Sequence, residues 1–256
     1  MVTPSSDTAV PSDMQRSAGH SEPAGRRLQA VLWDMDGTIV DTEPYWIEAE
    51  YGLVAAHGGT WSDEKAEGLV GQALTFSAGV LQEAGVQLSV REIIDTLTEE
   101  VTAKVRQAVP WRPGARELLL ELRDRGIPCA LVTMSEHALA AEVASHLPDG
   151  TFELLVTGDR VAKGKPDPEA YETAFEELSA RRPLDMARVV AIEDSLPGVT
   201  SAKAAGVLTL GVPHFVALPP DSSDHQWPTL DGRGVEDLED LVHPHAGDHS
   251  GRRRTA

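Results

Sequence analysis

Two aspartates separated by one residue follow the first strongly apolar stretch of the sequence. Residues 30–33 (AVLW) end at Asp34, and Asp36 and Gly37 come directly after. A short apolar stretch that ends in turn residues is typical of a buried strand, here of a parallel sheet. In extended backbone, residues two apart point to the same side, so both carboxylates could line one crevice. Since open α/β sheets bind ligands at the carboxyl ends of their strands, this pair is placed for chemistry.

Polar clusters end three further predicted strands. They are Thr133/Ser135 after residues 129–132, Asp159 with Lys163 and Lys165 after residues 152–156, and Glu193/Asp194 after residues 189–192. Parallel strands of a doubly wound sheet end on one shared edge, so we expect the four clusters to converge there. Any one cluster could instead be a turn or a helix cap, because Asp, Ser, Thr and Gly favour both. Four such clusters at successive strand ends favour a site.

The residue types of these clusters suit phosphoryl chemistry. Asp34, Asp36 and Asp194 offer hard oxygen ligands for Mg²⁺, which binds one or two carboxylates together with phosphate oxygens. One lysine and one hydroxyl suit a phosphate group. A metal-neutralised carboxylate can attack phosphorus, while a neighbouring carboxyl protonates the leaving oxygen and then activates water. The sequence offers no serine–histidine pair and no GxGxxG or GxxxxGK[ST] loop.

The elements around these clusters predict an α/β fold. Apolar stretches alternate with helical patterns from residue 111 to residue 210, which implies a parallel, doubly wound sheet with right-handed crossovers. Residues 44–108 are helical in pattern throughout. This segment is longer than an ordinary crossover, so we interpret it as a small helical domain inserted after the first strand.

The sequence therefore predicts four kinds of segment. We expect a disordered tail over residues 1–26, a catalytic core over residues 27–42 and 110–219, and an α-helical cap over residues 43–109. Residues 220–256 should hold one short helix followed by a disordered polar tail.

Composition narrows the function class. The formal charge of −19 argues against nonspecific binding to nucleic acid or to an anionic membrane. No window reaches the roughly 18 uninterrupted apolar residues of a membrane helix. The single Cys129 excludes an internal disulfide and fits a reducing compartment, so a cytoplasmic enzyme is expected. Cys129 lies in an apolar stretch and should be a buried, inert thiol.

Four ordered motifs carry a resemblance to a known family. Residues 34–42 (DMDGTIVDT) look like the first motif of the haloacid dehalogenase-like hydrolase superfamily, and Thr133 matches the second. Residues 164–168 (GKPDP) resemble the third motif, and residues 193–198 (EDSLPG) resemble the fourth. The resemblance covers residues 28 to about 213 and implies a Rossmann-like core with an α-helical cap between the first and second motifs.

The resemblance also implies roles for single residues. Asp34 would be the nucleophile and a Mg²⁺ ligand, and Asp36 the general acid/base, with its backbone carbonyl also facing the metal. Asp194 would complete the metal site, while Glu193 is either a further ligand or the partner of a ligand.

The phosphoryl group would be held by three further residues. The resemblance assigns this role to Thr133, the backbone N–H of Met134, and Lys165. Lys163 is interpreted as a solvated surface charge. Specificity would lie in the cap, which would close over the site about hinges near residues 41–43 and 109–113. A solvated helix face is the favoured interpretation of four polar residues of the cap, with substrate contact as the alternative: His57, Gln72, Thr75 and Arg106.

Asp36 also separates branches of this superfamily. The dehalogenase, phosphonatase and cation-pump branches lack an aspartate there, and an alkoxide leaving group needs protonation. We therefore expect a Mg²⁺-dependent phosphomonoesterase that acts on a small phosphorylated metabolite. The enzyme is expected to be a monomer or a weak homodimer.

Two alternatives remain open from the sequence. One is a β-phosphoglucomutase-like sugar phosphomutase, although Trp46 stands where that family typically carries a histidine. Trp46 would either form a wall of the substrate pocket or be a core aromatic. The other alternative is a catalytically silent regulatory binding protein, although such proteins usually lose an acidic residue of the motifs and none is lost here.

Overall fold

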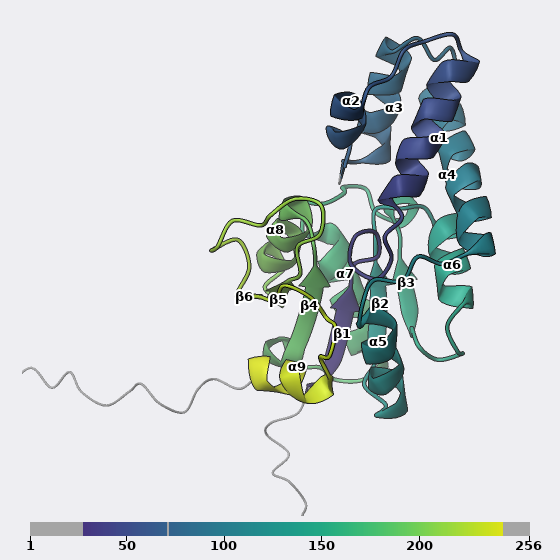
Figure 1. Cartoon of the computed structure of the whole chain (residues 1–256). Helices are drawn as coiled ribbons and strands as arrows, with labels where there is room; N and C mark the ends of the chain where they lie inside the picture. The colour runs from purple at the N-terminus through teal and green to yellow at the C-terminus, as the bar shows by residue number, and fades with distance from the viewer. Residues whose placement is uncertain (1–27, 71, 243–256) are drawn as a thin grey trace, which may run out of the picture.

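A six-stranded parallel sheet forms the centre of the computed structural model, which describes residues 28–70 and 72–242 (Figure 1). The strand order is β3-β2-β1-β4-β5-β6. The strands are β1 (Ala30–Trp33), β2 (Cys129–Val132), β3 (Leu154–Val156), β4 (Val189–Glu193), β5 (Leu208–Gly211) and β6 (His225–Gln226). Strand β1, the first in the sequence, therefore lies at the centre of the sheet. The strand order reverses there, and such folds bind ligands at that point.

Helices connect the strands and cover both faces of the sheet. Those after the first strand are α1 (Glu43–Ala56), α2 (Asp63–Glu67), α3 (Leu74–Glu83) and α4 (Val90–Gln107). Those that follow are α5 (Ala115–Asp124), α6 (His137–Ser145), α7 (Glu169–Arg181), α8 (Leu196–Ala204) and α9 (Val235–Leu241). The caps follow local sequence: Ser89 and Glu92 form a capping box at the start of α4, as the sequence indicates.

The central strand is buried on both sides. Val31 and Trp33 of β1 pack in one apolar cluster with residues of α5 and α6, whereas Ala30 and Leu32 pack in a second cluster with residues of α7. This alternation is the period of two expected of a strand. The fold is thus the predicted α/β, doubly wound, Rossmann-like sheet with an inserted helical block.

Helices α1 to α4 form that block and stand beyond the end of the sheet to which the strands' carboxyl ends point (Figure 1). The two chain segments that join it to the sheet run side by side. Val40 and Trp111 form an antiparallel bridge, and the Asp41 N–H donates to Pro110 O at 2.8 Å. The two connections therefore leave the sheet together, and α4 also packs against α6 of the core. The division into a core domain and a cap domain stays a prediction.

The segment after β5 departs from the sequence interpretation. Its apolar residues Leu230, Val235 and Leu238 are buried, and β6 adds a sixth strand that the sequence did not predict, because two residues carry no detectable period. The predicted tails over residues 1–26 and after α9 lie outside the described residues, apart from Val242. Cys129 is buried, as predicted. Within the described ranges, no helix combines the length and the apolar character that crossing a bilayer requires.

Candidate active site

Asp34 and Glu193 are brought together by the pairing of the two central strands. Trp33 of β1 pairs with Ile192 of β4, and the Asp34 N–H donates to Ile192 O at 3.0 Å. Asp34, directly after β1, and Glu193, the last residue of β4, therefore lie next to one another at the carboxyl edge of the sheet.

Lys165 lies between these two carboxylates. Its Nζ donates to Asp34 Oδ1 at 2.7 Å, to Glu193 Oε1 at 2.6 Å and to Val132 O at 2.8 Å. Burial alone would lower the pKa of Lys165, but the adjacent charges of Asp34 and Glu193 raise it above its ordinary value. The lysine is therefore a fixed buried cation whose three N–H donors are all used.

Glu193 is fully buried and hydrogen-bonded on both oxygens. Tyr171 donates its hydroxyl to Oε1 at 2.7 Å, and Ser195 donates its hydroxyl to Oε2 at 3.2 Å. A Cβ on Gly198 would lie 1.9 Å from Glu193 Cδ, so only glycine leaves room for this carboxylate. Glu193 thus positions Lys165 and has little capacity left for a metal ion.

Asp34 and Asp194 have the capacity that Glu193 lacks. Carboxylate oxygens of Asp34, Glu193 and Asp194 all lie within 4.8 Å of one another. Asp34 Oδ2 is buried and accepts no hydrogen bond, and within the described residues the Asp194 carboxylate has neither a hydrogen bond nor an ion pair. A Cβ on Gly37 (φ +84°) would lie 2.1 Å from Asp194 Oδ2, so this approach also depends on glycine.

The electrostatics of this group favour a bound cation. Burial, followed by the charge of Glu193, raises the pKa of Asp34 to about 7. Burial and the charge of Asp34 raise the pKa of Asp194 well above its usual range. A divalent cation would restore both carboxylates to their ionised form. Unpartnered carboxylate oxygens of this kind fit a hard cation such as Mg²⁺.

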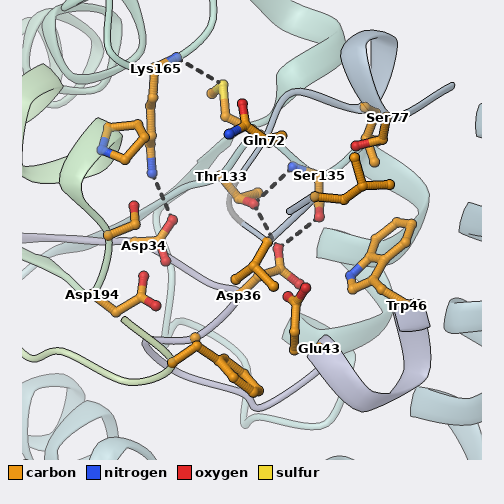
Figure 2. A pocket seen from close by; sticks show the side chains of 18 of the residues that line it. Asp34, Asp36, Glu43, Trp46, Gln72, Ser77, Thr133, Ser135, Lys165 and Asp194 are labelled. Carbon is orange, nitrogen blue, oxygen red and sulfur yellow. Dashed lines mark hydrogen bonds and ion pairs between the residues drawn. The ribbon is translucent and has the colours of Figure 1, made fainter. Parts of the chain in front are cut away.

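Asp36 points to a different set of partners (Figure 2). Ser135 donates its hydroxyl to Asp36 Oδ2 at 2.7 Å, and Thr133 donates to the same oxygen at 3.2 Å. Thr42 donates to Asp36 Oδ1. Thr42 stands at the N-cap of α1 but makes no side-chain cap bond there, so its hydroxyl serves Asp36 and links this carboxylate to the start of the helical block.

Unpaired backbone donors lie near the two aspartates. Within the described residues, the backbone N–H groups of Asp36 and Met134 donate to no acceptor, and both residues line the site. The Met134 sulfur accepts from the Lys165 N–H at 3.2 Å. Free N–H groups beside a buried lysine suit an anion with several acceptor oxygens.

A cavity of about 270 Å³ lies between the sheet edge and the helical block. Asp34, Asp36 and Asp194 line its floor. Residues of the helical block line the other side, among them Glu43, Trp46 and Glu50 of α1 and Ser77 of α3. Trp46 is buried in the core and also lines this cavity.

Residues 28–206 match a family model described as haloacid dehalogenase-like hydrolase. The chain belongs to this family. A phosphorylated carbohydrates phosphatase of Thermotoga maritima is 32% identical over 190 residues, which span 73% of this chain and 86% of that protein. An N-acetylmuramic acid 6-phosphate phosphatase of Pseudomonas aeruginosa is 32% identical over 78% of this chain and 88% of its own length.

A solved structure has the same fold. CbbY from Rhodobacter sphaeroides, in complex with xylulose-(1,5)bisphosphate, aligns with a TM-score of 0.74 at 26% identity and covers 82% of this chain and 99% of its own. The resemblance read from the four motifs of the hydrolase is therefore confirmed, and the chain is an enzyme of this family.

Most of the predicted site residues of the hydrolase line one cavity. They are Asp34, Asp36, Thr133, Met134, Lys165 and Asp194. Glu193 lies behind them, in contact with Lys165. Lys163 lies apart, with 71% of its side chain exposed and its ammonium 3.4 Å from Asp167. The roles assigned to these residues stay predictions.

Other lining residues were missed by sequence reasoning. Glu43, Glu50 and Ser77 face the cavity from the helical block. The sequence pattern could have indicated Glu50, because this charged residue lies on the same helix face as the apolar Ala49 and Leu53.

The possible cap contacts named from the sequence are mostly directed elsewhere. Of these four residues, Gln72 alone lines the cavity. His57 accepts from the Gln87 N–H at 3.3 Å, and Arg106 pairs with Glu142 of α6 at 2.7 Å.

Proposed function

We propose that this enzyme hydrolyses the phosphate monoester of a small metabolite through a phosphorylated Asp34, with Mg²⁺ as cofactor. The observation that carries the proposal is the position of Asp34. One of its oxygens is bound by Lys165, and the other is buried without a partner next to Asp194. Named relatives at 32% identity are phosphatases, which supports the same reaction class.

The donor set fits Mg²⁺. Asp34 and Asp194 would hold the ion, together with the backbone carbonyl of Asp36 that the family resemblance assigns. When bound, Mg²⁺ would neutralise charge on Asp34 and on the phosphate oxygens. Glu193 serves instead to hold Lys165 in place.

The chain's own residues account for both half-reactions. An Asp34 oxygen attacks phosphorus, and the bond between phosphorus and the ester oxygen breaks. Asp36 gives its proton to that leaving oxygen, which departs as the alcohol. Asp36 then takes a proton from a water molecule that attacks the phosphorus of phosphorylated Asp34, releasing inorganic phosphate and restoring the carboxylate.

Fixed donors would hold the transferring group during both steps. The free N–H groups of Asp36 and Met134 would donate to phosphoryl oxygens, and Lys165 would place a positive charge beside them. Thr133, which the resemblance assigns to phosphoryl binding, would also orient Asp36 through its hydroxyl. The hydroxyls of Ser135 and Thr42 orient the same carboxylate.

Two features support hydrolysis over sugar phosphomutase activity. Trp46 stands where the mutases typically carry a histidine. A mutase must also bind a bisphosphate, and Lys165 is the one lysine or arginine among the described residues that line the cavity. A second phosphate would therefore meet carboxylates instead of a cation.

Phosphate release from p-nitrophenyl phosphate tests the proposal. We expect hydrolysis that requires Mg²⁺ and is lost in Asp34→Asn, while Asp149→Asn, at an exposed position away from the cavity, stays as active as the wild type. Activity that survives in Asp34→Asn would refute the assigned nucleophile. Absence of hydrolysis with every phosphate ester tried would favour the silent binding protein, and turnover of a sugar phosphate that needs a bisphosphate primer would favour the mutase.

A further inference from the structure

The cavity is lined by many more acidic than basic side chains. Five of the described lining residues are carboxylic acids. Lys165 is the one lysine or arginine among the described residues that line the cavity. The acids are Asp34, Asp36, Glu43, Glu50 and Asp194. A site that binds only a phosphate ester of a neutral alcohol needs no such excess on its far wall.

The three acids on the sheet side are accounted for by the proposed reaction. Asp34 is paired with Lys165, and Asp34 and Asp194 fit the metal ion. Asp36 is held by three hydroxyls.

The two acids on the helical side have no such explanation. Within the described residues, the Glu43 carboxylate makes no hydrogen bond and no ion pair. Glu50 is 5% exposed and accepts one hydrogen bond, from the Trp61 indole N–H at 3.3 Å. Figure 2 shows the Glu43 carboxylate beside that of Asp36, the residue proposed to protonate the leaving oxygen.

A third polar group faces the same space from another helix. Ser77 of α3 is 5% exposed, and its hydroxyl has no hydrogen-bond partner among the described residues although it lines the cavity (Figure 2). A buried hydroxyl without a partner loses hydrogen-bond energy unless a ligand or water supplies one. Ser77 therefore points independently to a polar ligand group at this wall.

We propose that the leaving group of the substrate carries a protonated amine, which binds between Glu43 and Glu50 with Ser77 as a further acceptor. The inference rests on the proposed phosphatase function and adds the substrate class, a phosphate ester of an amino sugar or a similar amino polyol. The apolar wall formed by Trp46, Leu69 and Leu97 would contact the carbon ring of such a molecule.

The state of the two acids in the free enzyme agrees with this assignment. Burial, followed by the charge of Asp36, raises the pKa of Glu43 to about 8. Burial raises the pKa of Glu50 to about 7. An ammonium group brought next to them would favour the ionised carboxylates and form charge-assisted hydrogen bonds.

Matched pairs of esters test the inference with the full-length enzyme. Glucosamine 6-phosphate is compared with glucose 6-phosphate and with N-acetylglucosamine 6-phosphate, which lacks the charge. Ethanolamine phosphate is compared with ethylene glycol phosphate. We expect kcat/KM to be about tenfold or more higher for the amine in at least one pair, the worth of one charged hydrogen bond.

Two variants assign that preference to the carboxylates. Glu43→Gln and Glu50→Gln should each reduce the ratio of kcat/KM between amine and hydroxyl esters several-fold. Glu48→Gln, on an exposed position of the same helix, should keep the wild-type ratio. Circular dichroism confirms folding, and Glu43 serves as the second test position because it is less buried than Glu50.

The outcomes separate this inference from the proposed function. Hydrolysis of p-nitrophenyl phosphate without an amine preference in any pair would overturn the inference and leave the phosphatase function standing. A preference that is unchanged in both Gln variants would also overturn it. If wild-type enzyme hydrolyses neither p-nitrophenyl phosphate nor any ester of the panel, the proposed function fails and the inference falls with it.

Discussion

Lys165 Nζ lies 2.7 Å from Asp34 Oδ1, although the two residues are 131 positions apart in the chain. Asp34 follows the central strand β1, and Lys165 is held in place by the buried carboxylate of Glu193 at 2.6 Å. This contact joins the first motif of the family to the third. It also means that the proposed nucleophile is oriented before any substrate binds.

Replacing this lysine should damage both stability and activity. Lys165→Met leaves Asp34 and Glu193 buried beside each other without a cation, so we expect the free energy of unfolding in EDTA to fall by about 3–5 kcal/mol. Phosphate release should fall at least about 100-fold, because the fixed cation that orients Asp34 and faces the phosphoryl charge is lost. Urea denaturation and a phosphate assay measure the two effects. Lys163→Met is the matched control at an exposed lysine, and equal behaviour of the two variants would contradict the account.

Gly198 should be intolerant of even one methyl group. In Gly198→Ala the new Cβ meets the Glu193 carboxylate, which must move and release Lys165. We expect a loss of at least about 2 kcal/mol in the free energy of unfolding, together with reduced phosphate release. Gly52→Ala is the control: no atom lies within 4 Å of its added Cβ, and α1 should gain about 0.5–1 kcal/mol. A Gly198→Ala protein as stable and active as wild type would show that Glu193 does not position the lysine.

Magnesium should stabilise the folded protein through Asp194. Saturating Mg²⁺ compensates the unpartnered oxygens of Asp34 and Asp194, so the Tm should rise by several degrees relative to EDTA. Asp194→Asn should lose most of that rise, whereas Asp149→Asn should keep it. Differential scanning fluorimetry of the three proteins, each with Mg²⁺ and with EDTA, gives the six Tm values. A full Mg²⁺ response in Asp194→Asn would place the ion elsewhere.

The grouping of most predicted site residues could be anticipated from the sequence because these residues lie at the ends of strands. Once strands 30–33 and 189–192 are assigned to one parallel sheet, Asp34 and Asp194 must lie near each other. The residue types then restrict the chemistry, and Lys165 follows from its motif.

The far wall of the cavity could not be predicted in the same way. Which faces of α1 and α3 turn toward the sheet depends on how the helical block packs, and no local pattern records that. The sequence analysis therefore assigned neither Glu43 nor Ser77 to the site. Tyr171, which donates to Glu193, was also missed, because it lies within helix α7 and not at the end of a strand.

Glu50 should make stability depend on pH in a definite direction. Burial raises its pKa from 4.5 to about 7, so between these pH values the folded protein binds more protons than the unfolded chain. The free energy of unfolding then falls as pH rises through this window. Glu50→Gln removes that fall, so its stability relative to wild type should improve by on the order of 2 kcal/mol between pH 4 and pH 8.

Urea denaturation in EDTA at the two pH values measures this difference. Glu48→Gln, an exposed position of the same helix, should change by less than about 0.5 kcal/mol. A Glu50→Gln variant whose relative stability is the same at both pH values would show that this carboxylate is not held in a desolvated position.

Trapping of the phosphorylated enzyme tests the central claim most directly. Asp36→Asn should form the phosphoenzyme from an activated ester such as p-nitrophenyl phosphate, whose leaving group needs no proton, and should hydrolyse it slowly for want of a base. Acid quenching, peptic digestion and tandem mass spectrometry then locate the modification. The account predicts one added phosphoryl group on Asp34, absent when Asp34 is also replaced by Asn. A phosphoryl group on any other residue, or steady turnover with none on the protein, would contradict it.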